Sequence, residues 1–228
     1  MPYARPDFSE YVGHFTKDAV PIVADDIDPA NAAAVTQPAF DRLVNILRMG
    51  RILATAMPWT GRRAVALTEC PWGSLIDHSN KYLPFGIGFA KARIFAAGGG
   101  PALYLRPDLT EKQQREYRHN DDAERKGFHP HIWAFVTPFV PAYAPQGFLD
   151  DHWHNKPIVD YSHEREWRVP HDFTFHFDQV EFIVVETYDD MARFPRDLKD
   201  QIGRDKFLIL DVYRQIERLW PVHLIGGS

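Results

Sequence analysis

The alternation of apolar and polar residues predicts several short β-strands. In "VGHFT", residues 12–16, period-two alternation places Val12, His14 and Thr16 on one face of a strand. Phe15 lies on the opposite face. Strands are also predicted at 64–68 ("AVALT"), 85–89 ("FGIGF"), 101–105 ("PALYL"), 165–169 ("REWRV"), 172–177 ("DFTFHF") and 180–186 ("VEFIVVE").

A helical pattern begins at Pro38, a residue well suited to a first helical position. Apolar residues then recur at the i, i+3, i+4, i+7 spacing of a buried helix face, at Phe40, Leu43, Val44 and Leu47. Gly50 is a suitable C-terminal stop, and "RILAT" follows as a short extended piece. Further helices are predicted at 71–83, within 91–100 ("KARIFAAGGG", a short helix with a glycine stop), at 108–127, at about 189–202 and at about 206–220.

Strands and helices are interspersed without strict βαβ alternation, which favours an α+β fold with a mixed or antiparallel sheet. The length of 228 residues fits one domain, 1–228, with a core of ordinary size. The segment 108–127 has helix-forming composition and no apolar face, and residues 140–160 are rich in Pro, His, Asp and aromatics. We therefore expect a long loop or insertion at about 107–160.

Composition is typical of a soluble globular protein, with 45% hydrophobic and 25% charged residues. The formal net charge of −5 does not favour a protein that binds nucleic acid mainly through its phosphates.

One cysteine, Cys70, suits a reducing cytoplasm, and we expect it to be a buried structural residue because no activating base is close in sequence. No run of residues resembles a signal peptide or a membrane span, so we expect a cytoplasmic protein without a membrane partner.

Histidines are concentrated in one part of the chain, with eight of the eleven between His119 and His176. Two imidazoles at i and i+2 could share a strand face, as in "HPH" and "HWH". However, Pro130 interrupts the first pair, no HExxH motif occurs, and the single cysteine adds no ligand set. The prediction is therefore no metal site, with these histidines on the surface and in loops.

The segment "YSHEREWRVP", residues 161–170, carries the strongest candidate for chemistry. If "REWRV" is a strand that extends back to Glu164, then Glu164 and Glu166 share one face, opposite Arg165, Trp167 and Val169. Two interpretations remain open. The glutamates form a catalytic carboxylate pair, or they belong to a structural edge strand whose charges face water.

Three segments together resemble the DarT-like ADP-ribosyltransferases. They are "HFT" with "ILRMGRILAT", "LPFGIGF…GGGPALYL", and "REWRVPHDFTFHFDQVEFIVV". The resemblance implies a split β-sheet of ADP-ribosyltransferase type flanked by helices, with NAD as substrate. It assigns His14 and Thr16, with the backbone at Phe15, to the nicotinamide-ribose portion of NAD. It gives Glu166 the catalytic position and Glu164 an acceptor-side role.

The middle of the chain, "RAVALTECPWGSLIDHSNKYLPFGIGFAKARIFAAGGGPALYL", is similar to the AbiGi family of abortive phage-resistance proteins, which also open with "HFT". That family has been labelled an antitoxin. Its pattern favours tyrosine before "GIG", where this chain has Phe85. Neither resemblance extends over 107–160 or the C-terminal helices.

The resemblances imply an NAD-dependent ADP-ribosyltransferase that acts as a toxin or effector in bacterial anti-phage defence. An aromatic ring would stack on nicotinamide, with Phe85, Phe89 and Tyr104 as candidates. An arginine would pair with the pyrophosphate; Arg51 is one candidate, and Arg62 and Arg63 compete with it. The macromolecular acceptor, protein or nucleic acid, is open, and a cognate antitoxin or chaperone is a candidate partner. The alternatives are a non-catalytic antitoxin or phage-sensing binder of the same fold, and an NAD glycohydrolase.

Overall fold

A computed structural model describes residues 8–18, 37–69, 84–119, 131–142, 160 and 162–219. The chain divides into two compact units. Unit 1 comprises Met1–Arg51, Cys70–Lys91 and Thr174–Ser228, and unit 2 comprises Ile52–Glu69 and Ala92–Phe173. Each unit has its own strands, helices and buried residues.

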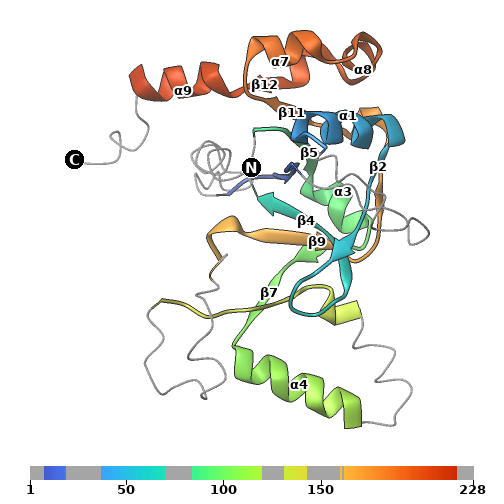
Figure 1. Cartoon of the computed structure of the whole chain (residues 1–228), viewed down its shortest axis with the longest axis vertical. Coiled ribbons are helices and arrows are strands. Elements are labelled where there is room, and N and C mark those ends of the chain that lie inside the picture. Colours follow the sequence, from blue (N-terminus) through green and yellow to red (C-terminus); the bar gives the residue numbers. More distant parts are fainter. Residues whose placement is uncertain are drawn as a thin grey trace, which may run out of the picture. The chain divides into compact units, whose positions relative to one another are not determined.

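Unit 1 contains four strands in the order β12-β11-β5-β1 (Figure 1). Their bounds are Tyr11–Phe15 for β1, Gly86–Ala90 for β5, Phe182–Val185 for β11 and Phe207–Ile209 for β12. β5 pairs antiparallel with both β1 and β11, whereas β11 and β12 are parallel. Gly88 is needed in β5 because a Cβ there would lie only 2.2 Å from the ring of Phe182.

Helix α1 (Ala39–Met49) has the apolar stripe that the sequence predicts. Its buried residues include the four predicted positions Phe40, Leu43, Val44 and Leu47. The helix ends at Gly50, whose φ of 57° is the left-handed conformation that glycine adopts without strain. The backbone N–H of Gly50 faces the carbonyl oxygens of Ile46 and Leu47, so the predicted C-terminal stop is confirmed.

The C-terminal part of unit 1 differs from the two long helices expected at about 189–202 and 206–220. The first is divided into α7 (Tyr188–Arg193) and α8 (Arg196–Ile202), because Pro195 holds the preceding residue, Phe194, in an extended conformation. The second begins later, at α9 (Leu210–Leu219), since residues 207–209 form β12. Figure 1 shows α7, α8 and α9 gathered beside β12. Two short 3₁₀ helices, Phe177–Gln179 and Arg204–Lys206, complete this region.

Unit 2 contains the strands β4 (Arg63–Glu69), β9 (Glu166–Val169) and β6 (Gly100–Pro101) in the order β4-β9-β6, all antiparallel. The short β3 (Thr55–Ala56) pairs with β4. A separate parallel pair joins β7 (Leu103–Leu105) to β8 (Val136–Pro138). The helices are α3 (Lys91–Ala96) and α4 (Pro107–His119).

Two predicted strands are shorter than expected. "PALYL" is divided into β6 and β7, because the N–H of Ala102 binds the oxygen of Glu166 while that of Leu103 binds Phe135. "DFTFHF" contributes only β10 (Phe173–Thr174), which pairs with β2 (Arg51–Ile52). A 3₁₀ helix capped by His176 follows it, and its hydrogen bonds replace a strand ladder.

The prediction of an α+β fold with a mixed, mostly antiparallel sheet flanked by helices is confirmed. Within the segment 107–160, expected to be a long loop or insertion, α4 corresponds to the helix predicted at 108–127, and β8 was not predicted. The helix predicted at 71–83 lies outside the described residues. Among the helices that the structure describes, none has the length and apolar character of a membrane span.

Candidate functional site

Glu166 and Arg168 form a buried ion pair on one face of β9. Arg168 Nε lies 2.8 Å from Glu166 Oε1, and Arg168 Nη2 lies 3.0 Å from Glu166 Oε2. The side chain of Arg168 is 3% exposed and that of Glu166 is 12% exposed. Both carboxylate oxygens therefore meet the planar fork of one guanidinium, which is the geometry that gives arginine–carboxylate pairs their strength and direction.

Arg168 also binds β8 and Ala134, which lies two residues before that strand. Its Nη1 donates to the carbonyl oxygens of Ala134 (3.1 Å) and Val136 (3.0 Å), and its Nη2 donates to Thr137 Oγ1. With the two bonds to Glu166, these contacts occupy all five N–H donors of a guanidinium. A charge this deeply buried is tolerated only when its donors are satisfied in this way.

Small cross-strand neighbours leave room for this arginine. Arg168 is opposite Ala66 on β4 and Gly100 on β6. Residues opposite one another in an antiparallel ladder present side chains to the same face of the sheet. The absence of a long side chain at either neighbour leaves that face to Arg168.

Tyr104, on β7, brings a phenol to the same carboxylates. Its hydroxyl oxygen accepts a hydrogen bond from the backbone N–H of Glu166, and its register partner on β8 is Thr137. Burial raises the pKa of Tyr104 to about 12, and the negative charges of Glu166 and then Glu164 add to the rise. The backbone N–H and the positive charge of Arg168 oppose it. Tyr104 is therefore a neutral hydrogen-bonding group at any physiological pH.

The prediction that Glu164 and Glu166 share a strand face through period-two alternation is wrong. β9 begins at Glu166, and Glu164 ends a 3₁₀ helix, Ser162–Glu164. Between them Arg165 has φ = 44°, a left-handed conformation that costs a non-glycine residue about 1–2 kcal/mol. The backbone thus turns between the two glutamates. Both nevertheless lie close enough to Tyr104 to act on its pKa.

A third glutamate belongs to the same region. Glu69, at the end of β4, has a side chain only 7% exposed, and Arg165 Nη1 lies 3.4 Å from its Oε1. We call Glu69, Glu164 and Glu166, with Arg165 and Arg168, the β9 carboxylate cluster. Glu69 and Glu164 are buried, and the side chain of Glu166 is 12% exposed, so the three carboxylates are largely withdrawn from water. Among the described residues, no group of three or more His, Cys, Asp or Glu is arranged to hold a metal ion.

The predicted residues on β1 lie in unit 1. Thr16 is 1% exposed, and its hydroxyl lies 2.8 Å from the carbonyl oxygen of Ala39 and 3.1 Å from that of Phe85. These contacts join the end of β1 to the first turn of α1 and to the residue before β5. His14 is half-buried on β1, in register with Ile87, and the ring of Phe15 packs beside Gly86.

The aromatic candidates differ in their surroundings. Phe85 is half-buried, with its ring 5.6 Å from that of Phe40 in an edge-to-face arrangement. Phe89 is fully buried and packs against Phe175 at 5.0 Å between ring centres. The ring of Phe89 is thus part of the core of unit 1, a setting that lends no support to stacking on a ligand.

The arginine candidates for a pyrophosphate also differ. Arg51 is exposed at the start of β2. Arg63 donates through Nε and Nη2 to the carbonyl oxygen of Ala54 at 3.1 and 2.8 Å and lies 3.7 Å from Asp172, so it serves the local fold of unit 2. The structure thus brings Tyr104, Glu164 and Glu166 together in unit 2. His14, Phe15, Thr16, Arg51, Phe85 and Phe89 belong to unit 1.

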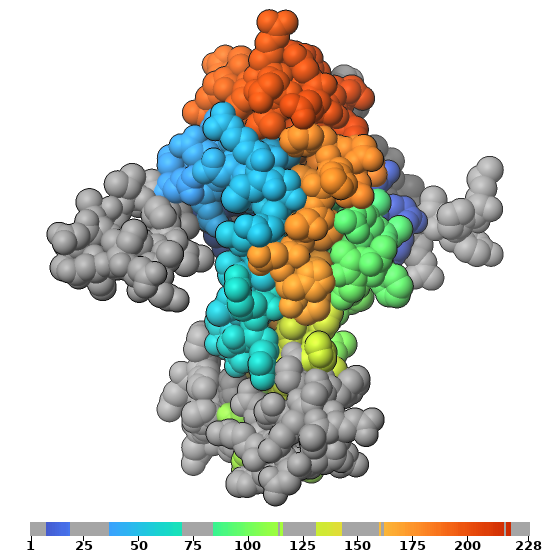
Figure 2. Space-filling view, turned by 90° about the vertical axis from the view of Figure 1, so that its right-hand side faces the viewer, coloured from blue at the N-terminus to red at the C-terminus, as the bar shows by residue number. Residues whose placement is uncertain are grey.

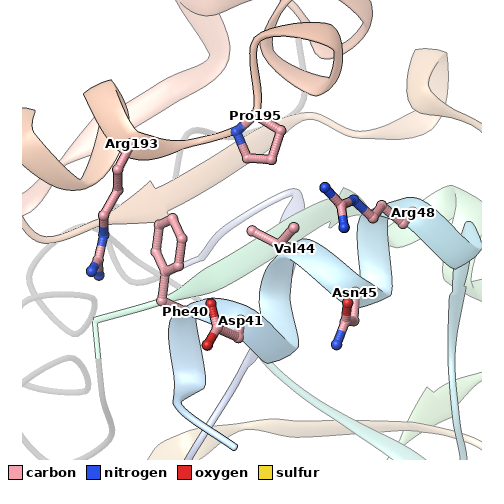
Figure 3. A pocket seen from close by; sticks show the side chains of 7 residues that line it. All are labelled: Phe40, Asp41, Val44, Asn45, Arg48, Arg193 and Pro195. Carbon is pink, nitrogen blue, oxygen red and sulfur yellow. The ribbon is translucent and has the colours of Figure 1, made fainter.

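A surface pocket of about 390 Å³ lies along α1 in unit 1. In Figure 2 the surface of α1 borders that of the orange-red C-terminal helices. Figure 3 shows Phe40 and Val44 between two arginines that come from α1 and from the end of α7. We call it the α1 pocket; its lining residues are Phe40, Asp41, Val44, Asn45, Arg48, Arg193 and Pro195. Arg193 stacks on Phe40 at 3.9 Å and pairs with Asp190 at 2.8 Å.

Sequence reasoning missed Arg168, Thr137 and Glu69. One signal was present for Arg168, since an arginine two residues after a glutamate shares its face on a strand. The contribution of β8 had no such signal, because Thr137 lies 31 residues from Arg168 in sequence and only the fold brings them together.

Comparison with known proteins leaves the site to be interpreted from its geometry. No protein family matches the chain, and no curated protein or solved structure is significantly similar to it.

Proposed function

We propose that the protein is an NAD-dependent ADP-ribosyltransferase, with a split β-sheet of that type, that acts as a cytoplasmic toxin or effector in bacterial anti-phage defence. The observation that carries the proposal is the carboxylate of Glu166, fixed by Arg168 beside Glu164 and Tyr104. The order of motifs along the chain, with "HFT" first and the glutamates late, supports it by resemblance.

The proposed reaction requires a fixed negative charge. The bond between C1′ of the ribose and the nicotinamide nitrogen breaks, the electron pair leaves with neutral nicotinamide, and positive charge develops on the ribose. A carboxylate that is already oriented stabilises that charge without reorganisation, an effect worth a factor of about 10²–10³ in rate for one such group. Glu166 takes this role.

The acceptor supplies the second half of the transfer. Its nucleophilic atom forms the new bond to C1′ and loses a proton, for which Glu164 is the proposed base. Glu164 is 10% exposed and lies on the far side of the Arg165 turn from Glu166, so the two carboxylates have separate backbone supports. In unit 1, His14 and Thr16 are assigned to NAD by resemblance alone. The acceptor, protein or nucleic acid, and a cognate antitoxin or chaperone remain to be found by experiment.

One observation favours a second function. Both oxygens of Glu166 are already paired with Arg168, as in an ion pair that only stabilises a fold. A non-catalytic antitoxin or phage-sensing binder would have this arrangement without turning over NAD. An NAD glycohydrolase, the third candidate, would transfer ADP-ribose to water.

The test is incubation of the purified protein with NAD labelled in its ADP-ribose part, in the presence of a whole-cell lysate. Released nicotinamide is measured by chromatography, and labelled macromolecules are divided by nuclease and protease treatment. The variants are Glu166→Gln and, as a matched control, Glu186→Gln. Glu186 also pairs with an arginine, Arg214, at 3.1 Å, but it lies outside the β9 carboxylate cluster.

We expect Glu166→Gln to lower nicotinamide release by about 100-fold or more and Glu186→Gln to leave it unchanged. Circular dichroism and thermal unfolding confirm that each variant is folded. Full activity of folded Glu166→Gln removes Glu166 from catalysis. NAD binding without cleavage supports the non-catalytic binder, and nicotinamide release without a labelled macromolecule supports the glycohydrolase. Absence of both binding and cleavage contradicts all the NAD-dependent functions.

A further inference from the structure

We infer that Arg168 is a positioning residue for the reaction, acting on substrate only through the carboxylate of Glu166. The inference rests on the proposed function. Arg168 is 2% exposed and all of its donors are used within unit 2, so it contacts no ligand itself. Arg168 therefore affects the reaction rate only by orienting the carboxylate of Glu166.

The two bonds from Arg168 determine the plane of the Glu166 carboxylate. A glutamate side chain has three rotatable bonds, and a single hydrogen bond leaves the carboxylate free to turn about the last of them. Two parallel bonds to Oε1 and Oε2, at 2.8 and 3.0 Å, remove that freedom. Each oxygen keeps a lone pair that faces away from Arg168, and these lone pairs keep a constant direction.

The guanidinium is itself held by a rigid support. The carbonyl oxygens of Ala134 and Val136 and the hydroxyl of Thr137 bind its other donors. β8 is in turn paired with β7, in the register that places Thr137 beside Tyr104. The orientation of Glu166 is thus transmitted from backbone atoms, which are more precisely placed than a surface side chain.

Lysine cannot replace arginine in this arrangement. An ammonium group has three donors and no planar fork, so it can satisfy one carboxylate oxygen and one or two of the acceptors on and beside β8, but not all five contacts. Arg168→Lys therefore keeps the buried charge and removes the constraint on the carboxylate. This separation of charge from geometry makes it the informative variant.

The test is a double-mutant cycle with wild type, Arg168→Lys, Glu166→Gln and the double variant, measured as steady-state nicotinamide release from NAD. We expect Arg168→Lys to lower kcat by about 10-fold or more, with the KM for NAD changed by less than about twofold. In the Glu166→Gln background the same change has no further effect. Additive losses in kcat overturn the inference, because a residue that acts through Glu166 cannot add to its removal.

Two further variants separate positioning from folding. Thr137→Val removes one partner of Arg168 without altering Glu166, and it should lower kcat a few-fold only when Glu166 is present. If Arg168→Lys does not fold, the Thr137→Val cycle decides the question. Lys199→Met is the control for a buried cation in unit 1, since Lys199 is 7% exposed and donates to the carbonyl oxygens of Met191 and Ala192 at 3.0 Å. It should leave kcat unchanged.

A readout that does not need NAD distinguishes failure of the inference from failure of the proposed function. Tyr104 titrates under the influence of the Glu166 carboxylate, so its phenolate absorbance, identified by difference from Tyr104→Phe, reports movement of that carboxylate. Arg168→Lys should shift this titration more in the wild-type background than in Glu166→Gln, where only the direct effect of the charge at residue 168 on Tyr104 remains. If the wild-type protein does not cleave NAD and this pattern holds, the proposed function fails and Arg168 still positions Glu166. Equal shifts in both backgrounds overturn the inference itself.

Discussion

The β9 carboxylate cluster of unit 2 and the α1 pocket of unit 1 both contain acidic residues and arginines, but these side chains are mostly buried in the cluster and exposed in the pocket. In the cluster, the side chains of Glu69, Glu166 and Arg168 are between 3% and 12% exposed and are held in pairs. In the pocket, the side chain of Arg193 is 55% exposed, and Asp41 and Arg48 are exposed as well. Charges that remain in water have little influence on stability, whereas buried charges depend on every partner.

This difference separates two uses of charge. A ligand that reaches the α1 pocket meets side chains that can move and that water already solvates. A ligand that reaches the cluster meets carboxylates whose positions are set before it arrives. Preorganisation of this kind is the physical basis of electrostatic catalysis, which is why the proposed chemistry is assigned to the cluster rather than to the pocket.

Removal of Arg168 is expected to have the largest effect. Arg168→Met leaves the Glu166 carboxylate buried without its partner, and breaking a buried pair from one side costs about 3–5 kcal/mol of unfolding free energy. Arg193→Met, in the α1 pocket, removes an exposed pair and one ring contact and should cost about 1 kcal/mol or less. Urea unfolding of both variants measures the difference. Equal losses would mean that burial does not distinguish the two regions.

Truncation of Phe89 tests whether its ring belongs to the core or to a ligand site. Because the ring is fully buried against Phe175, Phe89→Ala should cost about 3–5 kcal/mol of unfolding free energy. Phe89→Leu keeps most of the apolar volume and should lose less. Calorimetric titration with NAD should give the same affinity for folded Phe89→Leu as for wild type. A large loss of affinity with little loss of stability would restore the stacking role.

The sequence predicts those parts of the fold that depend on local pattern. The stripe of α1, its end at Gly50 and the strands at β1, β4, β5, β9 and β11 follow from periodicity and from glycine at the helix C-terminus. Residues 207–209 resemble the start of a helix in sequence, yet they form β12 because β11 offers an open edge beside them. Such tertiary pairing overrides local preference.

In the candidate site, too, the sequence predicts residues better than it predicts their arrangement. Glu164, Glu166 and Tyr104 were predicted as candidates from motifs, and the structure brings these three together. Their arrangement was not predicted, since the left-handed turn at Arg165 is not a conformation that sequence pattern assigns to arginine. The partners of Arg168 on and beside β8 come from long-range packing, which no spacing rule along the chain contains.

Two glycines with left-handed backbone give a smaller, paired comparison of the units. A Cβ at Gly50, in unit 1, would lie 3.0 Å from the carbonyl oxygen of Phe175, whereas one at Gly61, in unit 2, would meet nothing within 4 Å. Gly61→Ala should therefore cost only the strain of a left-handed alanine, about 1–2 kcal/mol. Gly50→Ala should cost more than Gly61→Ala in unfolding free energy. Equal losses would show that the backbone near Phe175 adjusts without penalty.

The smallest effect is a change in the pKa of Tyr104, which measures the electrostatic influence of the β9 carboxylate cluster on that residue. Burial comes first among the causes that raise its pKa to about 12, followed by Glu166 and Glu164. Glu166→Gln should therefore lower the pKa of Tyr104 while leaving it above its ordinary value of 10.0, because burial and Glu164 remain. Titration of the phenolate absorbance measures this change, and the matched control is Asp41→Asn in the α1 pocket, which should leave the titration unchanged. A shift of equal size in Asp41→Asn would assign the raised pKa to the net charge of the protein rather than to the cluster.

The same raised pKa makes stability depend on pH at the alkaline end. Above the unfolded-state pKa the unfolded chain loses the phenolic proton of Tyr104 while the native protein retains it, so stability falls as pH rises from about 10 to about 12. Urea unfolding at a series of alkaline pH values should show this loss in wild type and not in Tyr104→Phe. An identical loss in both proteins would mean that other groups govern alkaline unfolding, and that the buried phenol beside Glu166 does not set the stability of unit 2 in this range.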